Sequence, residues 1–165
     1  MCCESVTRTE FRVEEKTDPA INEQFQKDIE ARILYYSQRI ENIQQRLNEL
    51  DSEWDIERVL ETQASALTVV GVLLGITACK KWFLLPAIVG GFFLQHAITG
   101  WCPPVPLFRR LGIRTMREIN QERYGLKALK GDFDEINSKT DEPPQSKALK
   151  VINAVKVDDI KRAVL

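Results

Sequence analysis

Two long apolar runs fill the middle of the chain and predict a membrane hairpin. They cover residues 62–79 and 82–101, and only Lys80 and Lys81 carry charge between Ala64 and Trp101. Each run has about the 20 residues that a helix needs to cross the ~30 Å hydrocarbon core of a bilayer. In a soluble protein, helices that are apolar on every face would need far more covering chain than this sequence has. We therefore expect two transmembrane helices over residues 62–102, joined by a two-lysine turn.

Small residues follow one face of each apolar run. They are Ala64, Thr68, Gly71, Gly75 and Ala78 in the first run and Ala87, Gly90, Gly91 and Ala97 in the second. Small side chains let membrane helices approach closely, so we expect these stripes to close the hairpin on itself or on a second copy. Trp82 and Trp101 lie nineteen positions apart, a helical rise of roughly 28 Å. This spacing would place one indole at each membrane interface.

A heptad-like pattern precedes the hairpin. Asp18 can cap a helix that starts at Pro19, and no glycine or proline interrupts residues 20–70. Apolar residues then recur alternately every four and three positions, which is typical of a coiled coil. The seam consists of Ile29, Ile33, Tyr36, Ile40, Ile43, Leu47, Leu50 and Trp54. We expect a flexible segment over 1–19 and one long coiled-coil helix over 20–61; the alternative is an amphipathic helix that packs on its own protein or on the membrane surface.

The region after the hairpin is basic and then mixed. The pattern predicts a basic juxtamembrane helix over 103–133, interrupted near Gly125, a linker over 134–147, and a short C-terminal helix over 148–165. The expected fold class is therefore all-α, a membrane helical hairpin with a long N-terminal cytoplasmic coiled-coil helix and short C-terminal helices.

The charges near the ends of the hairpin predict its orientation. Arg46 and Arg58 precede the first span, and Arg109, Arg110, Arg114 and Arg117 follow the second, against two lysines in the turn. By the positive-inside rule, both termini are expected in the cytoplasm. We also assign the four arginines after the second span to contacts with anionic lipid headgroups.

Composition narrows the function classes. The 165 residues carry a formal net charge of −1, which gives no attraction for nucleic acid over the whole molecule. Cys2, Cys3, Cys79 and Cys102 are too few and too scattered for a disulfide framework, so we expect reduced thiols. The first two are expected to be exposed thiols, with acylation as the alternative. The polar opening segment predicts no cleavable secretory signal. No spacing of metal ligands, phosphate loop or dinucleotide fingerprint is present, so we predict no metal and no cofactor.

Cys102 and His96 are the candidates for chemistry. Cys102 stands in "AITGWCPPVP", where it is either a reactive interfacial thiol or a small neighbour of a proline helix stop. The carboxyl end of a helix disfavours a thiolate, so we favour the helix stop and expect a thiol pKa at or above about 8.5. His96 lies inside the second span with Gln95 and Thr99. These three residues form either a polar track through the bundle or, as we favour, an interhelical hydrogen bond that joins the helices.

Residues 75–113, "GITACKKWFLLPAIVGGFFLQHAITGWCPPVPLFRRLGI", resemble the YgaP-like inner-membrane family. The resemblance rests on two short apolar helices with a tight turn, the run Thr99 to Pro103, and the pair Leu111 and Gly112. It implies a two-span domain in a bacterial inner membrane. Some members carry a rhodanese sulfurtransferase domain before the hairpin, which implies a link to sulfur handling. In this chain a helical segment stands in that position.

Together these patterns predict an integral membrane protein of the structural and interaction class, without catalysis of its own. The expected partners are the lipid bilayer, further copies of the chain and a cytoplasmic protein, and no nucleic acid. Two alternatives stay open. The first is a thiol-dependent sulfur-handling protein that uses Cys102. The second is a small-solute channel built from oligomerised hairpins, whose polar lining would come from Gln95, His96 and Thr99.

Overall fold

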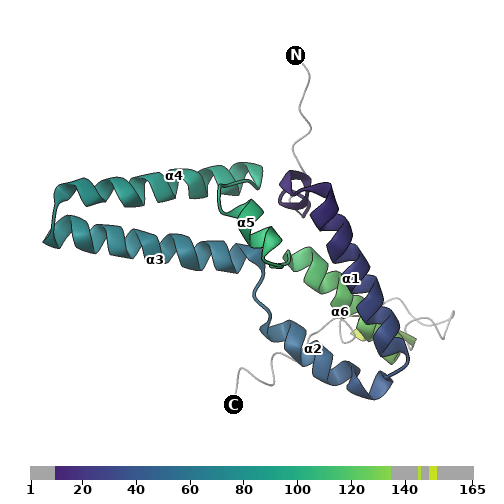
Figure 1. Cartoon of the computed structure of the whole chain (residues 1–165). Helices are drawn as coiled ribbons and strands as arrows, with labels where there is room; N and C mark the ends of the chain where they lie inside the picture. The colour runs from purple at the N-terminus through teal and green to yellow at the C-terminus, as the bar shows by residue number, and fades with distance from the viewer. Residues whose placement is uncertain (1–9, 135–144, 146–148, 152–165) are drawn as a thin grey trace.

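The computed structural model describes residues 10–134, 145 and 149–151 (Figure 1), and all the regular elements of this part of the chain are helices. No strand occurs in this part of the chain, so the predicted all-α class is confirmed. The α-helices are α1 (Pro19–Ser37), α2 (Ile43–Ser52), α3 (Ile56–Thr77), α4 (Leu84–Thr99), α5 (Val105–Arg110) and α6 (Met116–Lys130). The short 3-10 turns are η1 (Glu14–Lys16), η2 (Ile40–Asn42) and η3 (Lys80–Phe83).

Helices α3 and α4 form a long antiparallel hairpin that extends away from the other helices (Figure 1). Both are long and apolar enough to cross a membrane. Large apolar side chains cover the outside of the hairpin, for example Ile76 at 70% exposure and Ile98 at 74%. Residues 62–77 of α3 and the whole of α4 contain no Asp, Glu, Lys or Arg, as expected of membrane-spanning segments. Trp82 in η3 and Trp101 after α4 lie at opposite ends of α4, as predicted.

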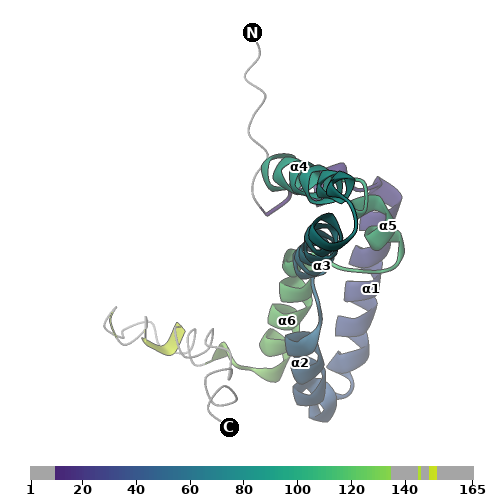
Figure 2. The ribbon, with the colours of Figure 1, turned by 90° about the vertical axis from the view of Figure 1, so that its left-hand side faces the viewer.

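The remaining long helices, α1, α2 and α6, form a compact bundle at the open end of the hairpin (Figures 1 and 2). Helix α1 begins where the sequence predicts, because the Asp18 carboxylate accepts a hydrogen bond from the Ala20 N–H and Pro19 occupies the first turn. Helix α6 begins with a capping box between Thr115 and Glu118. We call this group of three helices the bundle.

The expected single coiled-coil helix over 20–61 is wrong, because the chain turns back on itself between α1 and α2. Helix α1 ends at Ser37, and residues 53–55 separate α2 from α3. Four seam residues, Ile29, Ile43, Leu47 and Leu50, are buried within this one chain. The last three of them form a core cluster with Ile119 and Leu126 of α6. The apolar stripe is therefore the core face of a bundle, which is the alternative that the pattern had left open.

The other four seam residues lie at the margins of the bundle. Ile33 and Tyr36 are partly buried, whereas Ile40 is 55% exposed and Trp54 is 46% exposed. The predicted interruption near Gly125 is also wrong, because α6 runs through this residue to Lys130. A Cβ atom on Gly125 would lie 2.7 Å from Cδ1 of Ile33. The glycine thus lets α1 and α6 approach each other rather than ending the helix.

The region of the predicted basic helix over 103–133 contains two helices, the short α5 and the longer α6. Val13, Ile56, Leu60, Cys102 and Val105 form a second apolar cluster where α5 meets the start of α3. The backbone N–H of Ile56 donates to the carbonyl of Arg114, at 2.9 Å, which fixes the start of α3 to the start of α6. Most of the predicted linker and C-terminal helix, like residues 1–9, lies outside the described residues.

Candidate functional site

A polar joint connects the bundle end of the molecule to the hairpin. His96 of α4 is 1% exposed, and its Nε2 lies 2.8 Å from Oε2 of Glu57, near the start of α3. Arg12 donates to the other carboxylate oxygen of Glu57 at 2.9 Å and to the carbonyl of Ala97 at 3.0 Å. The donor and acceptor roles in the His96 contact depend on the histidine tautomer. We call Arg12, Glu57 and His96 the joint.

The backbone around the joint leaves no space for side chains. Gly100 ends α4 in the left-handed region, with a φ of 73°. A Cβ atom at this position would lie 2.5 Å from the carbonyl oxygen of Arg12. Glycine is therefore required here both for its conformation and for the close approach of the N-terminal segment. Pro103 and Pro104 follow within four residues, as expected of a helix stop.

The structure separates the three residues of the predicted polar track. Gln95 and Thr99 are exposed, and the Thr99 hydroxyl donates to the carbonyl of Gln95 within α4. His96 alone points to α3, where it meets Glu57. This arrangement is the interhelical hydrogen bond that we favoured over a track. The Nδ1 atom of His96 is buried without a hydrogen-bond partner in the described part of the chain.

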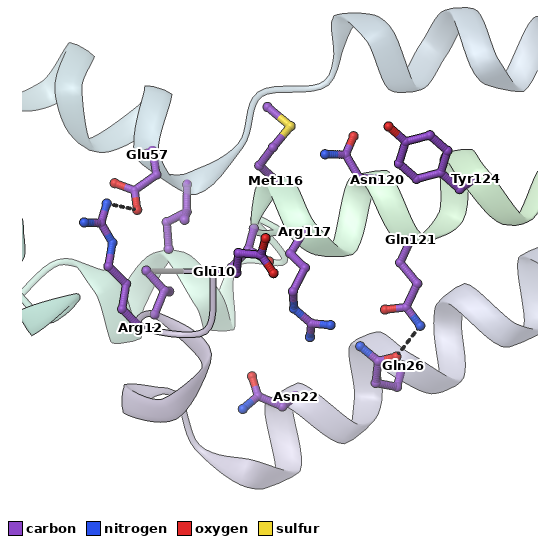
Figure 3. Close-up of a pocket in the computed structure, with 13 residues that line it drawn as sticks. Glu10, Arg12, Asn22, Gln26, Glu57, Met116, Arg117, Asn120, Gln121 and Tyr124 are labelled. Atoms are coloured by element: carbon purple, nitrogen blue, oxygen red, sulfur yellow. Dashed lines mark hydrogen bonds and ion pairs between the residues drawn. The ribbon is translucent and has the colours of Figure 1, made fainter. Parts of the chain in front are cut away.

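A cavity of about 760 Å³ opens beside the joint (Figure 3). Its wall comes from the N-terminal segment, α1, the start of α3 and α6, and it consists of Glu10, Arg12, Val13, Asn22, Gln26, Ile56, Glu57, Thr115, Met116, Arg117, Asn120, Gln121 and Tyr124. Gln121 donates to Gln26 across it at 2.8 Å. Four amide side chains give donors and acceptors for an uncharged polar ligand. The sequence held no signal for this cavity, because its wall joins segments up to 114 positions apart.

Several polar groups in the wall of this cavity have partners within the protein. Its arginines are engaged, because Arg117 pairs with Glu14 and Arg12 pairs with Glu57. The Thr115 hydroxyl donates to the Glu14 carboxylate at 2.9 Å and caps α6, so it has a structural role at the start of this helix. The arrangement can hold a polar molecule by hydrogen bonds.

Cys102 is buried next to the helix stop. It is 3% exposed and belongs to the apolar cluster at the start of α3. Burial raises the pKa of the Cys102 thiol, and the negative charge of Glu57 raises it further, against one favourable backbone contact from Val105. The expected direction of this pKa is confirmed. An apolar cavity of about 200 Å³ lies next to Cys102, between α3 and α4.

Three of the four arginines assigned to lipid headgroups have partners inside the protein. Arg109 is buried and forms two hydrogen bonds of 2.7 Å with the Glu118 carboxylate. Arg114 is buried between Glu53 and Glu122. Arg117 pairs with Glu14. The headgroup assignment is therefore corrected for Arg109 and Arg114, whose guanidinium groups do not reach the surface, and Arg117 is held inward as well. Arg110 is exposed.

Glu122 is the centre of the arginine network in the bundle. Its carboxylate is fully buried and accepts hydrogen bonds from Arg32, Arg46 and Arg114. Burial acts to raise the pKa of Glu122, but the hydrogen bonds from Arg46 and Arg114 outweigh it and hold the pKa below its ordinary value. Burial likewise opposes the charge on Arg114, and its two carboxylate partners still raise its pKa. The network therefore stays ionised at neutral pH.

The two small-residue stripes have different surroundings. Gly71 and Gly75 of α3 face α4, where added Cβ atoms would lie 2.6 Å from Cδ of Pro86 and 2.9 Å from the Phe83 ring. Ala64 and Thr68 are partly buried on the same face. On α4, Gly90 and Gly91 have no atom within 4 Å of an added Cβ, and Ala87 is exposed. Only the first stripe therefore packs the hairpin on itself.

The fold and the joint define a two-span membrane hairpin that carries a helical bundle. Residues 55–118, or 64 of the 165, match the family described as "Inner membrane protein YgaP-like, transmembrane domain". The chain thus contains a YgaP-like transmembrane domain, which confirms the resemblance seen in the sequence and identifies a membrane protein. No curated protein and no solved structure matches the chain. No group of three metal-ligating side chains occurs among the described residues.

Proposed function

We propose that this protein is a membrane anchor of the structural and interaction class, which holds its helical bundle at the cytoplasmic face of a bacterial inner membrane and has no catalysis of its own. The joint carries this proposal. Arg12, Glu57 and His96 connect the N-terminal segment with both helices of the hairpin. A bundle tethered by a flexible linker would not need such a buried connection. The joint instead fixes the orientation in which the bundle is presented.

The bundle offers an apolar tip for a cytoplasmic protein partner. Leu34, Tyr35 and Ile40 are exposed where α1 turns into α2, at 68%, 51% and 55%. Arg39 stacks on the Tyr35 ring at 4.1 Å, which holds this ring in place. A rigid aromatic side chain among aliphatic neighbours is typical of the centre of a protein interface.

Self-association is the second part of the proposal, and its surface is the outer face of α4. Ala87, Gly90 and Gly91 leave this face flat, so a second membrane helix can approach it closely. Lipid can cover the large apolar side chains elsewhere on the hairpin without cost. Their exposure therefore does not indicate a surface for a second helix. The coiled-coil seam has no part in this association, because its buried residues serve the bundle core.

The test of self-association compares small-to-large replacements on the two helices of the hairpin. The double variant Ala87→Leu and Gly91→Leu blocks the flat face of α4, whereas Ala66→Leu adds a leucine at an exposed position of α3. We expect the native chain and the Ala66→Leu variant to have the mass of an oligomer in mild detergent, and the double variant to have that of a monomer. A native chain that is monomeric both in detergent and in nanodiscs contradicts the proposal.

The test of the anchoring role uses the joint. Glu57→Gln keeps the shape of the side chain but removes the charge that Arg12 needs, and Glu61→Gln is the matched control on an exposed turn of α3. A photo-crosslinker at Tyr35 in native membranes should capture a defined protein in the native chain and in the control, and less of it in Glu57→Gln. Equal capture in all three would show that the orientation of the bundle is irrelevant.

A further inference from the structure

A second polar cavity, of about 480 Å³, lies between α1, α2, the end of α5 and the segment that follows α5. Five of its eleven lining residues are arginines, a far larger share than in the cavity beside the joint. The wall consists of Ile21, Gln24, Phe25, Asp28, Arg32, Arg46, Glu53, Arg109, Arg110, Gly112 and Arg114. We call it the arginine cavity.

Three arginines of this cavity share one buried carboxylate. Arg32, Arg46 and Arg114 all donate to the single carboxylate of Glu122. Glu53 gives Arg114 a second partner. Glu49 gives Arg46 a second partner as well, at 3.0 Å.

Two further arginines of the wall retain unused donors. Arg109 is stacked on Phe25 at 4.3 Å and bonded to Glu118, but its buried Nε has no hydrogen-bond partner among the described residues. Arg110, next to it, is exposed and forms no ion pair with any described residue. The carboxylates that face the wall or pair with it are Asp28, Glu49, Glu53, Glu118 and Glu122, so five carboxylates match the five arginines, and Arg110 is the arginine that pairs with none of them.

We propose that the arginine cavity binds a phosphate group, with Arg110 as its main contact. Guanidinium groups form paired, charge-assisted hydrogen bonds with phosphate oxygens, and a fixed set of them is preorganised for such an anion. The ion pairs of Arg32, Arg46 and Arg114 hold the wall rigid, and Arg110 supplies the charge that has no partner. Two sources carry this chemistry. One is a free phosphate or phosphate ester, and the other is an anionic lipid headgroup, because Arg110 follows the end of α4 by only eleven residues.

The test uses the full chain in a maltoside detergent that contains no phosphate. Inorganic phosphate is titrated against chloride at constant ionic strength, and binding is followed by thermal stability and by ³¹P line broadening. We expect saturable binding, weakened roughly tenfold or more in Arg110→Glu by loss of a charge-assisted contact. Arg39→Glu, an exposed arginine at the far tip of the bundle, is the matched control and should bind as the native chain does.

The second arm separates the two sources. Native mass spectrometry from nanodiscs of phosphatidylglycerol and phosphatidylcholine reports bound lipid. Retention of phosphatidylglycerol that is lost in Arg110→Glu but kept in Arg39→Glu, without a response to inorganic phosphate, assigns the cavity to a headgroup. The proposal is overturned if neither anion binds, or if binding is the same in Arg110→Glu. Circular dichroism of each variant verifies the fold, and Arg32→Gln, a second wall variant, should weaken binding in the same direction.

Discussion

The hairpin and the bundle bury opposite kinds of side chain. In the hairpin, Ile98 is 74% exposed, while Gly71 and Gly75 occupy the interface between the helices. In the bundle, Glu122 has no exposed surface at all and serves three arginines. The same chain thus places apolar groups outside in one region and charges inside in the other. The surrounding medium explains the difference, because lipid covers Ile98 as well as protein would, whereas water would not.

This contrast implies that the two regions are held together by different forces. No hydrophobic driving force joins α3 to α4 in a bilayer, so their association depends on close packing at the glycines and on the hydrogen bond of His96. The bundle has a small apolar core, and its buried ion pairs are costly when only one partner is removed. A different kind of substitution should therefore destabilise each region.

The largest effect is expected at Glu122 in the bundle. Glu122→Gln preserves the shape of the side chain but leaves three arginines around a neutral amide, which should lower the free energy of unfolding by about 3–5 kcal/mol. Urea unfolding followed by circular dichroism in detergent measures this. The control is Glu49→Gln, which removes an exposed partner of Arg46 and should cost less than about 1 kcal/mol. An equal loss of unfolding free energy in both variants would show that the buried arginine network stabilises the bundle no more than an exposed ion pair does.

The matching substitution in the hairpin concerns packing alone. Gly71→Leu drives a side chain into Pro86, and such overpacking costs about 1–3 kcal/mol. Gly90→Leu adds the same side chain where no atom lies within 4 Å. The first variant should lower the melting temperature of the hairpin in detergent, and the second should leave the monomer unchanged. Similar melting of both variants would contradict the close packing of α3 on α4 at Gly71.

The bundle and the hairpin should differ in their stability toward acid. The pKa of Glu122 is lowered in the folded state, so its contribution to stability is complete above the unfolded value, near 4.5, and is lost as the pH falls through the lower folded value. The membrane-spanning segments contain no aspartate or glutamate. Circular dichroism between pH 7 and 2 should therefore show the bundle helices melting below about pH 4.5 while the hairpin stays helical. Loss of all helices in one step would mean that the regions unfold together.

The sequence predicted the hairpin well because its signals are local. Length, charge depletion and the two tryptophans can be read from one continuous stretch of sequence, and the helix start at Asp18 and the proline stop after α4 are equally local signals. The bundle was harder to predict, because a heptad pattern indicates that one face of a helix is buried but does not identify the helix that packs against it. Ile43 and Leu47 fit a coiled coil as well as they fit α6.

The candidate sites were harder still, since their parts meet only in the fold. Arg117 and Glu14, for instance, are 103 positions apart. A count of positive charges near a membrane cannot reveal such partners, so buried arginines were assigned to lipid. His96 was predicted as an interhelical contact from its polarity alone. Its partner Glu57 was not predicted, because this residue lies in the segment that was expected to form a coiled coil.

The smallest expected effect concerns the labelling of two cysteines, which tests the side of the membrane on which the turn of the hairpin lies. Cys79 is exposed in the turn between α3 and α4, whereas Cys102 is buried and its thiol pKa is raised by that burial. The proposed topology, with both termini in the cytoplasm, places this turn on the outside of the membrane. A membrane-impermeant maleimide added to intact cells should therefore label Cys79 and leave Cys102 unlabelled. Cys79→Ser should abolish the signal.

The same reagent distinguishes orientation from burial once the membrane is opened. In permeabilised cells that carry Cys79→Ser together with Cys2→Ser and Cys3→Ser, Cys102 should react only after a denaturant exposes it, because neither access nor thiolate formation is favoured in the folded state. Rapid labelling of Cys102 without denaturant would mean an accessible and activated thiol, and would restore the sulfur-handling alternative. Labelling of Cys79 only after permeabilisation would place the turn in the cytoplasm and reverse the proposed topology.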